Sequence, residues 1–444
     1  MTGTLTVDDT TAAVAPDDSA IGRATIRRVS LRLLPFLFVL YICAHIDRAN
    51  VGIAALQMNR DLRFSAAVYS FGAGIFYLGY ALFEVPSNLV LARVGARRWI
   101  ARIMITWGAL ASAMMFVRTP ASFYILRFLL GAAEAGFFPG VVFYLTAWFP
   151  AADRARAVSR FMLAVPVASV LSGAVAGPLL GLQGRLGLAG WQWLFLLEGL
   201  PSVVLGATVL AYLVDSPEAA RWLAPEQRTW LTDRLRREHQ ACAARHGASL
   251  RRALATPMVW QLGIAWAMAF VGTSVYLFWA PQLIRELSGR SVGWIGGVLA
   301  AIAFTAGLAM LFNAVHSDRS GERWLHVAVP FTMTALAWLV IATSSSPTVK
   351  LVGLAIAYPC ILSIYGPFWC LPSTFLTGEA AAGGLALVSS IGALGGFLGP
   401  NLLGAAQQAT GSPRAGFFVL AALAATAACL VLRLRATSRS RATA

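Results

Sequence analysis

Apolar runs of about twenty residues recur along almost the whole chain, and they leave room for few architectures other than a membrane bundle. A helix of that length crosses the ~30 Å hydrocarbon layer of a bilayer, because each residue adds about 1.5 Å. Only 12% of the 444 residues are charged, against about 25% in a typical soluble domain. The sequence therefore predicts an all-α, polytopic membrane protein with twelve transmembrane helices, at residues 31–56, 66–91, 98–117, 121–148, 157–182, 190–213, 258–282, 292–313, 324–343, 349–376, 380–407 and 414–434.

The strongly basic balance, a net charge of +16, does not indicate a nucleic-acid partner. The Lys and Arg residues lie between apolar runs and form no single basic patch of the kind that binds a phosphate backbone. The five cysteines are scattered and show neither zinc spacing nor a disulfide framework. We expect the lipid bilayer as surroundings, no nucleic acid, no metal, no cofactor, and a monomer.

The distribution of Lys and Arg predicts how the helices are oriented. Twelve spans place both termini on one side, and the segments on that side carry twenty-five Lys and Arg residues. The loops on the other side carry eight. Cytoplasmic loops are enriched in basic residues, so we expect both termini in the cytoplasm and the chain in a bacterial-type inner (plasma) membrane.

One long polar segment divides the spans into two groups of six. It predicts a cytoplasmic linker with a short surface helix, because Pro217-Glu218 and Pro225-Glu226 resemble helix starts. Residues 1–22 lack the apolar core of a signal peptide and predict a disordered tail. The expected organisation is a disordered cytoplasmic tail, a six-helix half, the linker, a second six-helix half and a cytoplasmic tail, at 1–30, 31–213, 214–257, 258–434 and 435–444.

The two halves carry signs of a duplication. Arg93-x-Gly95 follows span 2 and Arg319-x-Gly321 follows span 8, at an offset of 226 residues. GAVAGP at 173–178 in span 5 is matched by GGFLGP at 395–400 in span 11, at an offset of 222. Parallel six-helix repeats are typical of one large class of secondary transporters, in which the substrate site lies between the halves near mid-membrane.

Several blocks resemble a known family. They include DRANVGIAAL in span 1, RFLLGAAEAGFFPGVVFYLTAWFP in span 4, HSDRSGERWLHV between spans 8 and 9, and GPFWCLPSTFLTGEAAAGG in spans 10–11. The chain resembles the anion:cation symporter family of the major facilitator superfamily between residues 35 and 405. The resemblance implies uptake of an organic anion with protons, a cavity-facing Tyr80, and gating loops that contain Arg93, Arg97, Asp318 and Arg319. The sequence departs from the family pattern at Ala92, where the 2–3 loop usually has an acidic residue. It also has Ser389 and Ala393 where relatives often have Asn in span 11, so the resemblance does not extend to a ligand hydrogen bond from that helix.

Ionisable residues inside the spans are the candidate functional residues, because each costs roughly 2.5–3.5 kcal/mol to insert. Counting about 1.5 Å per residue from the ends of the spans places Asp47, Arg48, Arg127 and Glu198 in one layer of the N-terminal half. Glu134 follows Arg127 by seven residues, which predicts the same helix face two turns deeper. Neighbouring helix positions point about 100° apart, so Asp47 and Arg48 can face different surroundings.

The predicted roles follow from this chemistry. Arg48 and Arg127 bind the substrate carboxylate, because a guanidinium matches two carboxylate oxygens. Asp47 and Glu134 carry protons: when the substrate occupies the arginine, the carboxyl group that it balanced becomes easier to protonate. Glu198 and His45 are expected in a supporting ion-pair network, although a packed or pore-lining His45 is an equal alternative. The C-terminal half offers neutral groups such as Tyr276 and Tyr365 for the rest of the substrate.

Three alternatives remain at this point. A proton antiporter that exports drugs or metabolites is suggested by GAVAGPLLG at 173–181, which matches the antiporters' span-5 motif in part. A membrane enzyme lacks a clustered nucleophile, metal ligands and a cofactor loop in the sequence, and a receptor lacks a large output domain. The scarcity of Asn and Gln in the C-terminal half favours an aromatic or short carboxylate over a sugar acid.

Overall fold

The computed structural model describes residues 20–245, 257–371 and 378–443, and the described secondary structure is helical throughout. Twelve helical stretches are long and apolar enough to span a membrane, so the predicted number and class of elements are confirmed. The N-terminal half contains α1 (Ala20–Asp61), α2 (Ala66–Val94), α3 (Ala96–Ala113), α4 (Pro120–Glu134), α5 (Phe137–Thr146), α6 (Ala151–Met162), α7 (Ala164–Leu180) and α8 (Gly190–Tyr212), with short 3₁₀ turns at Met114–Phe116 and Arg185–Gly187.

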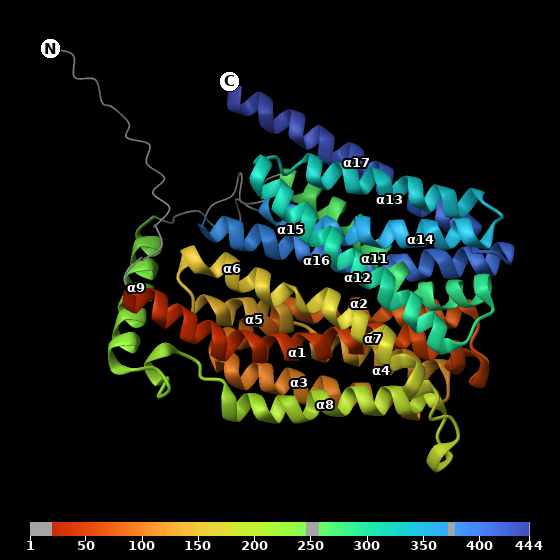
Figure 1. The fold of residues 1–444 in the computed structure, drawn as a ribbon, viewed down its shortest axis with the longest axis horizontal. Coiled ribbons are helices and arrows are strands. Elements are labelled where there is room, and N and C mark those ends of the chain that lie inside the picture. Colours follow the sequence, from red (N-terminus) through yellow and green to blue (C-terminus); the bar gives the residue numbers. More distant parts are fainter. Residues whose placement is uncertain (1–19, 246–256, 372–377, 444) are drawn as a thin grey trace.

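The second half follows a connecting segment that holds a 3₁₀ turn, Pro217–Ala219, and α9 (Pro225–Arg245). Its spans lie roughly along the same direction as those of the first half, whereas α9 stands across them at one end of the bundle (Figure 1). The helices of the C-terminal half are α11 (Pro257–Ser288), α12 (Val292–Ser320), α13 (Leu325–Thr343), α14 (Pro347–Ser363), α15 (Tyr365–Cys370), α16 (Gly378–Thr410) and α17 (Arg414–Thr443).

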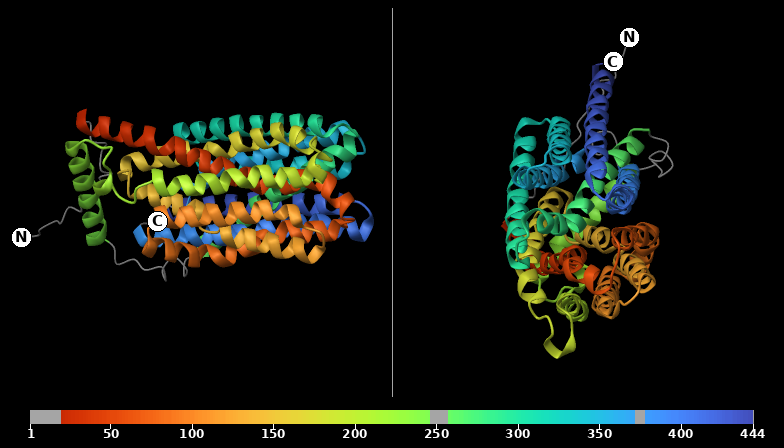
Figure 2. Two further views of the ribbon diagram at one scale, coloured as in Figure 1. Left: turned by 90° about the horizontal axis from the view of Figure 1, so that it is seen from below. Right: turned by 90° about the vertical axis from the view of Figure 1, so that its right-hand side faces the viewer.

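The two halves pack side by side, with the first and the last halves of the chain forming separate groups in the end-on view (Figure 2). Helix α2 packs against α16, and α7 packs against α12. These helices are spans 2, 11, 5 and 8, so the two contacts are equivalent under a six-span repeat. The duplication inferred from short motifs thus accounts for the way the halves meet.

The closest backbone approaches between the halves lie at the end of the bundle away from α9. A Cβ atom added to Gly173 would overlap the carbonyl oxygen of Gly296, and one on Gly52 would overlap that of Leu277. Glycine is required at such positions because any side chain would separate the two helices. At the same end, Tyr69 Oη donates to the Phe278 carbonyl oxygen at 2.6 Å.

Span 4 is broken, and this differs from the continuous helix predicted over 121–148. Gly136 takes a left-handed backbone conformation (φ 86°), so α4 ends at Glu134 and α5 begins at Phe137. Ser87 Oγ on α2 donates to the Ala135 carbonyl oxygen at 2.7 Å. That bond satisfies an acceptor freed by the break. Glu134 is the last residue of α4 and lies two turns beyond Arg127 on the same helix, which is the predicted spacing.

The outer parts of the chain also differ from prediction. Helix α1 begins at Ala20, so residues 20–30 are helical and are not part of a disordered tail. Helix α17 continues to Thr443, beyond the expected end at 434. The surface helix expected within 214–257 is present as α9. The expectations for residues 1–19, 246–256 and 372–377 lie outside the described residues.

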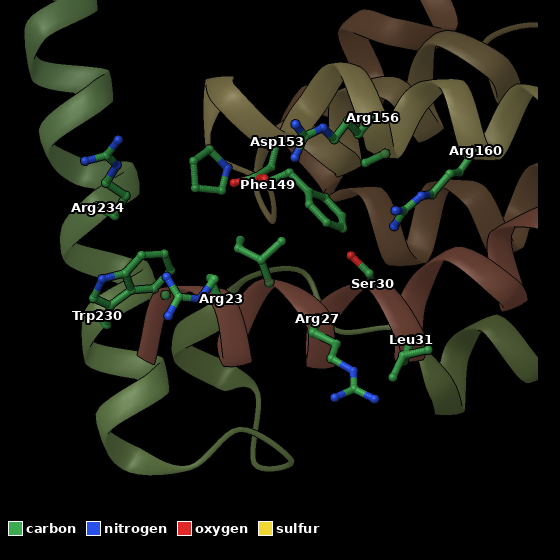
Figure 3. Close-up of a pocket in the computed structure, with 14 residues that line it drawn as sticks. Arg23, Arg27, Ser30, Leu31, Phe149, Asp153, Arg156, Arg160, Trp230 and Arg234 are labelled. Carbon is green, nitrogen blue, oxygen red and sulfur yellow. The ribbon is translucent and has the colours of Figure 1, made fainter. Parts of the chain in front are cut away.

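The end of the bundle beside α9 is strongly basic. A cavity of about 360 Å³ lies between α1, α6 and α9, and its side chains come from all three helices (Figure 3). Five of the lining residues are arginines and one is acidic: Arg23, Arg27, Arg156, Arg160, Arg234 and Asp153. The described structure thus brings together basic residues that are far apart in sequence.

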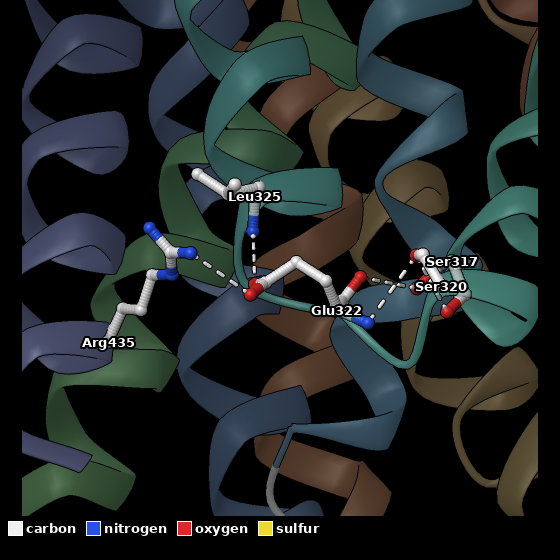
Figure 4. A network of polar contacts seen from close by, with 5 residues as sticks. All are labelled: Ser317, Ser320, Glu322, Leu325 and Arg435. Atoms are coloured by element: carbon white, nitrogen blue, oxygen red, sulfur yellow. Dashed lines mark hydrogen bonds and ion pairs between the residues drawn. The ribbon is translucent and has the colours of Figure 1, made fainter. Parts of the chain in front are cut away.

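The first predicted gating loop binds its own half and the start of the linker, and the second binds within its own half. The Arg97 backbone N–H donates to Asp215 Oδ1 at 2.8 Å, and its side chain donates to the Leu210 carbonyl oxygen. Asp318 pairs with Arg323 at 3.1 Å, while Arg93 and Arg319 are exposed. In the second loop Glu322 pairs with Arg435 of α17 at 3.1 Å and accepts the Leu325 N–H (Figure 4).

Candidate functional site

An ion pair joins α1 to the end of α4. Arg48 Nε donates to Glu134 Oε1 at 2.6 Å, and the exposed fractions of the two side chains are 14% and 1%. The Arg48 guanidinium also lies 5.0 Å from the centre of the Tyr80 ring. A buried carboxylate is tolerated when a guanidinium takes the place of water. The sequence prediction placed Arg48 in one layer with Asp47, Arg127 and Glu198 and placed Glu134 two turns deeper, whereas the structure joins Arg48 directly to Glu134.

The second predicted arginine, Arg127, lies next to this pair and is 1% exposed. It donates to the carbonyl oxygens of Gly72 and Ala73 at 3.2 and 3.1 Å. Its guanidinium and that of Arg48 lie 4.7 and 5.7 Å from the same ring, Phe76. Two of the five N–H groups of Arg127 are therefore used to hold α2 against α4.

Asp47 faces away from Arg48, as expected for neighbouring helix positions. Asp47 Oδ2 accepts the indole N–H of Trp107 at 2.7 Å and the hydroxyl of Ser202 at 3.1 Å. The carboxyl group is 2% exposed and lies between α1, α3 and α8. Two donors on one oxygen stabilise the ionised form of this buried group.

Glu198 and His45 form no ion pair with a described residue, so the ion-pair network predicted for them is not found. The reason is that both guanidinium groups of this layer are engaged elsewhere, Arg48 with Glu134 and Arg127 with α2 carbonyls. Glu198 instead lies within electrostatic reach of Asp47 and beside the side-chain amide of Asn50. His45 is 9% exposed and packs inside the half, which agrees with the packed alternative.

The predicted tyrosines of the C-terminal half lie in neutral surroundings. The Tyr276 ring stacks on Tyr358 with centres 3.6 Å apart, and its hydroxyl makes no hydrogen bond. The Tyr365 hydroxyl lies 3.3 Å from that of Thr273. Tyr276 also lines a small cavity between α1, α7 and α12, together with Ala49 of the other half. Tyr276 thus lies where the two halves meet, whereas Tyr365 contacts α11 of its own half.

Several residues that shape this site were not predicted from the sequence. They are the donors to Asp47, the ring shared by the two arginines, and the ring across the interface from Arg127, namely Trp107, Ser202, Phe76 and Phe278. Each lies in an apolar run and has no charge or spacing that sets it apart. Asn50 was visible as a polar residue in span 1, but nothing in the sequence connected it with Glu198.

Comparisons with known proteins agree with this architecture. The sequence profile of the Major Facilitator Superfamily matches residues 37–400. A candidate tartrate transporter of Agrobacterium vitis is 45% identical over 95% of this chain and 97% of its own. A quinolone resistance transporter of Acinetobacter baumannii is 40% identical over 89% of this chain and 91% of its own. The xylose transporter XylE from E. coli, in a partially occluded inward-open state, superimposes with a TM-score of 0.73 at 14% identity, covering 92% and 98% of the two chains.

Together the twelve spans, the paired halves and these matches define a membrane-embedded secondary transporter. The chain belongs to the major facilitator superfamily. It is a multi-pass transport protein and not an enzyme, which confirms the prediction made from the absence of catalytic motifs.

Proposed function

We propose that this transporter carries an organic carboxylate together with protons, by alternating exposure of a site between its halves. The single observation that supports the proposal most strongly is the buried Arg48–Glu134 pair at 2.6 Å. It presents a guanidinium in an aromatic surrounding, with a carboxylate of the protein as its ligand. A substrate carboxylate has the same chemistry and can replace Glu134 on the arginine.

Replacement explains the coupling. Once the substrate anion occupies Arg48, the Glu134 carboxylate is left buried without its counter-charge, which is unfavourable unless it binds a proton. Anion binding and proton binding then favour each other, and by linkage the effect is equal in both directions. Arg127 lies beside the same Phe76 ring and supplies further donors to the substrate. Asp47 carries a second proton on the other side of α1.

The C-terminal half completes the site with neutral groups. Tyr276 and Tyr365 contact the part of the substrate away from the carboxylate, and Tyr80 lies beside Arg48. The small number of amide side chains favours a short or aromatic carboxylate. The relative named for tartrate, a short dicarboxylate, supports this class of substrate.

The basic end of the bundle faces the cytoplasm in this proposal. The arginine-lined cavity, α9 and the start of α1 all lie there (Figure 3), and positive-inside asymmetry is the usual determinant of orientation. The protein is then an inner-membrane carrier with both termini inside. The loops that contain Arg93, Arg97, Asp318 and Arg319 close this side when the carrier opens outward.

Export of a drug in exchange for protons is the second candidate, because one relative is named for quinolone resistance. The two functions predict opposite proton movements. In an importer, substrate added outside brings protons into the vesicle, whereas in an exporter the inward movement of protons drives substrate out.

The decisive experiment uses purified protein in proteoliposomes with a trapped pH dye. Tartrate and other hydroxy-dicarboxylates, aromatic carboxylates and sugar acids are added outside, one at a time. Internal acidification by one compound, absent in Arg48→Ala and present in the control Arg118→Ala on the opposite loop, is the expected result. A rise in internal pH when a quinolone is added outside the vesicles, with no response to any carboxylate, would instead indicate exchange of the drug for protons, as export requires.

A further inference from the structure

A group of buried polar atoms without hydrogen bonds lies on the side of α1 away from Arg48. It consists of Asp47 Oδ1, both carboxyl oxygens of Glu198 and both amide atoms of Asn50. The three residues are 2%, 9% and 1% exposed. Buried polar atoms in proteins nearly always have a partner, so this group requires an explanation that the substrate site does not provide.

The geometry brings the three side chains together. Ser202 Oγ on α8 donates to Asp47 at 3.1 Å, and Glu198 lies one helical turn before Ser202, on the same face. Asn50 lies three residues after Asp47 on α1, about one turn further. The charges of Asp47 and Glu198 interact, and the Asn50 amide approaches Glu198. Glu198 therefore faces a carboxylate and an amide, with no guanidinium beside it.

The surrounding ionisable groups do not neutralise this pair. Cys43 on α1 lies within electrostatic reach of both carboxyl groups and is uncharged as a thiol. Glu134 at the end of α4 adds negative charge but is bound to Arg48. Helix α3 contributes Trp107, and α8 contributes Ser202, both neutral donors. Two ionised carboxylates in such a site repel each other and cannot both persist.

We propose that Glu198 is a resident proton site, neutral at pH 7, whose O–H donates to the free oxygen of an ionised Asp47. The assignment to Glu198 rests on the number of donors: Asp47 Oδ2 accepts two hydrogen bonds, from Trp107 and Ser202, whereas the one donor beside Glu198 among the described residues is the Asn50 amide. This hydrogen bond gives a partner both to Asp47 Oδ1 and to one oxygen of Glu198. The Asn50 amide then binds the remaining carbonyl oxygen.

The inference rests on the proposed function only for its role in the transport cycle. In that cycle Asp47 accepts the transported proton, and neutral Glu198 holds its carboxylate in place until it does. Glu198 is thus a positioning residue for proton transfer. A neutral Glu198 should tolerate replacement by glutamine, because glutamine resembles a protonated glutamate in shape and as a hydrogen-bond donor.

The first test requires no transport. Infrared spectra of the purified protein at pH 7 without substrate should contain the carbonyl band of a protonated carboxylic acid. Part of that band should be missing in Glu198→Gln and unchanged in Glu226→Gln, a variant of the surface helix α9. A difference spectrum with no lost band, recorded on folded Glu198→Gln, means that Glu198 is ionised and overturns the proposal.

The second test measures uptake in vesicles. Glu198→Gln should transport within about twofold of the wild type, whereas Glu198→Leu, which cannot donate, should lose roughly tenfold. Loss of transport in Glu198→Gln, with its fold intact, contradicts a neutral Glu198. The alternative that would overturn the proposal is a sodium ion bound by the same oxygens. In that case the carboxylic acid band is absent in sodium buffer, and uptake depends on sodium. Failure of transport for every carboxylate leaves the infrared result unaffected.

Discussion

The two halves of this transporter share a fold but differ sharply in buried charge. Six buried side chains of the N-terminal half are ionisable, namely His45, Asp47, Glu84, Arg127, Glu134 and Glu198. Among the described residues of the C-terminal half, the buried polar side chains are those of Ser, Thr and Tyr, and no Asp, Glu, Lys, Arg or His is buried. Duplication thus preserved the packing of the helices, while the chemistry became concentrated on one side.

This difference suggests a division of labour between the halves. Anion binding and proton binding must influence each other through charge, which acts strongly only over a few ångströms in a buried site. In the proposed mechanism both functions therefore lie in one half, around α1 and α4. The C-terminal half then provides a neutral, aromatic surface for the rest of the substrate.

The largest expected effect comes from removing the guanidinium of Arg48. Arg48→Ala should weaken substrate binding by about 2–5 kcal/mol, which is about 30-fold or more. It also leaves Glu134 buried without a partner, which costs about 3–5 kcal/mol in stability. The double variant Arg48→Ala/Glu134→Gln removes that stability defect and should still not transport. Recovery of uptake in the double variant would show that Arg48 is needed for folding and not for the substrate.

Asp47→Asn should separate binding from coupling. The amide keeps the contacts with Trp107 and Ser202 in part but cannot bind and release a proton. Accumulation driven by a pH gradient should be abolished, while exchange of substrate across the membrane continues. Uptake of labelled substrate with and without a pH gradient measures both. Persistent accumulation would assign the coupling to Glu134 alone.

Smaller effects are expected in the C-terminal half. Tyr276→Phe removes a hydroxyl that has no hydrogen bond within the protein, so the loss is limited to one contact with the substrate. We expect KM to rise by about 2- to 10-fold, corresponding to about 0.5–1.5 kcal/mol, with an unchanged ratio of protons to substrate. Tyr144→Phe, whose hydroxyl binds the Val214 carbonyl oxygen away from the site, is the control. A change in the proton ratio would contradict the division of labour.

The number and class of helices could be predicted from the sequence because a helix that crosses a membrane requires an apolar run of about twenty residues. The charges in the sequence also indicated the candidate site, since Arg48, Glu134, Arg127 and Asp47 stand out against an apolar background. The sequence could not show which of these charged residues contact each other. Arg48 on α1 pairs with Glu134 at the end of α4, and the packing of α8 brings Glu198 to Asp47 instead of to an arginine. Such pairings depend on backbone angles and helix rotation, which leave no mark on the spacing of charged residues.

The smallest effects should distinguish the two copies of the gating loop. In the first copy Asp215 accepts the Arg97 N–H at 2.8 Å, and in the second Asp318 pairs with Arg323 at the surface with 67% of its side chain exposed. Asp215→Ala should lower the free energy of unfolding by about 1 kcal/mol, and Asp318→Asn by less than about 1 kcal/mol. Thermal unfolding in detergent measures both. If Asp318→Asn nevertheless slows transport while leaving stability unchanged, its carboxylate acts in the state that is closed to the cytoplasm, where the loop meets the opposite half. An effect of equal size on stability and transport would confine Asp318 to its own loop.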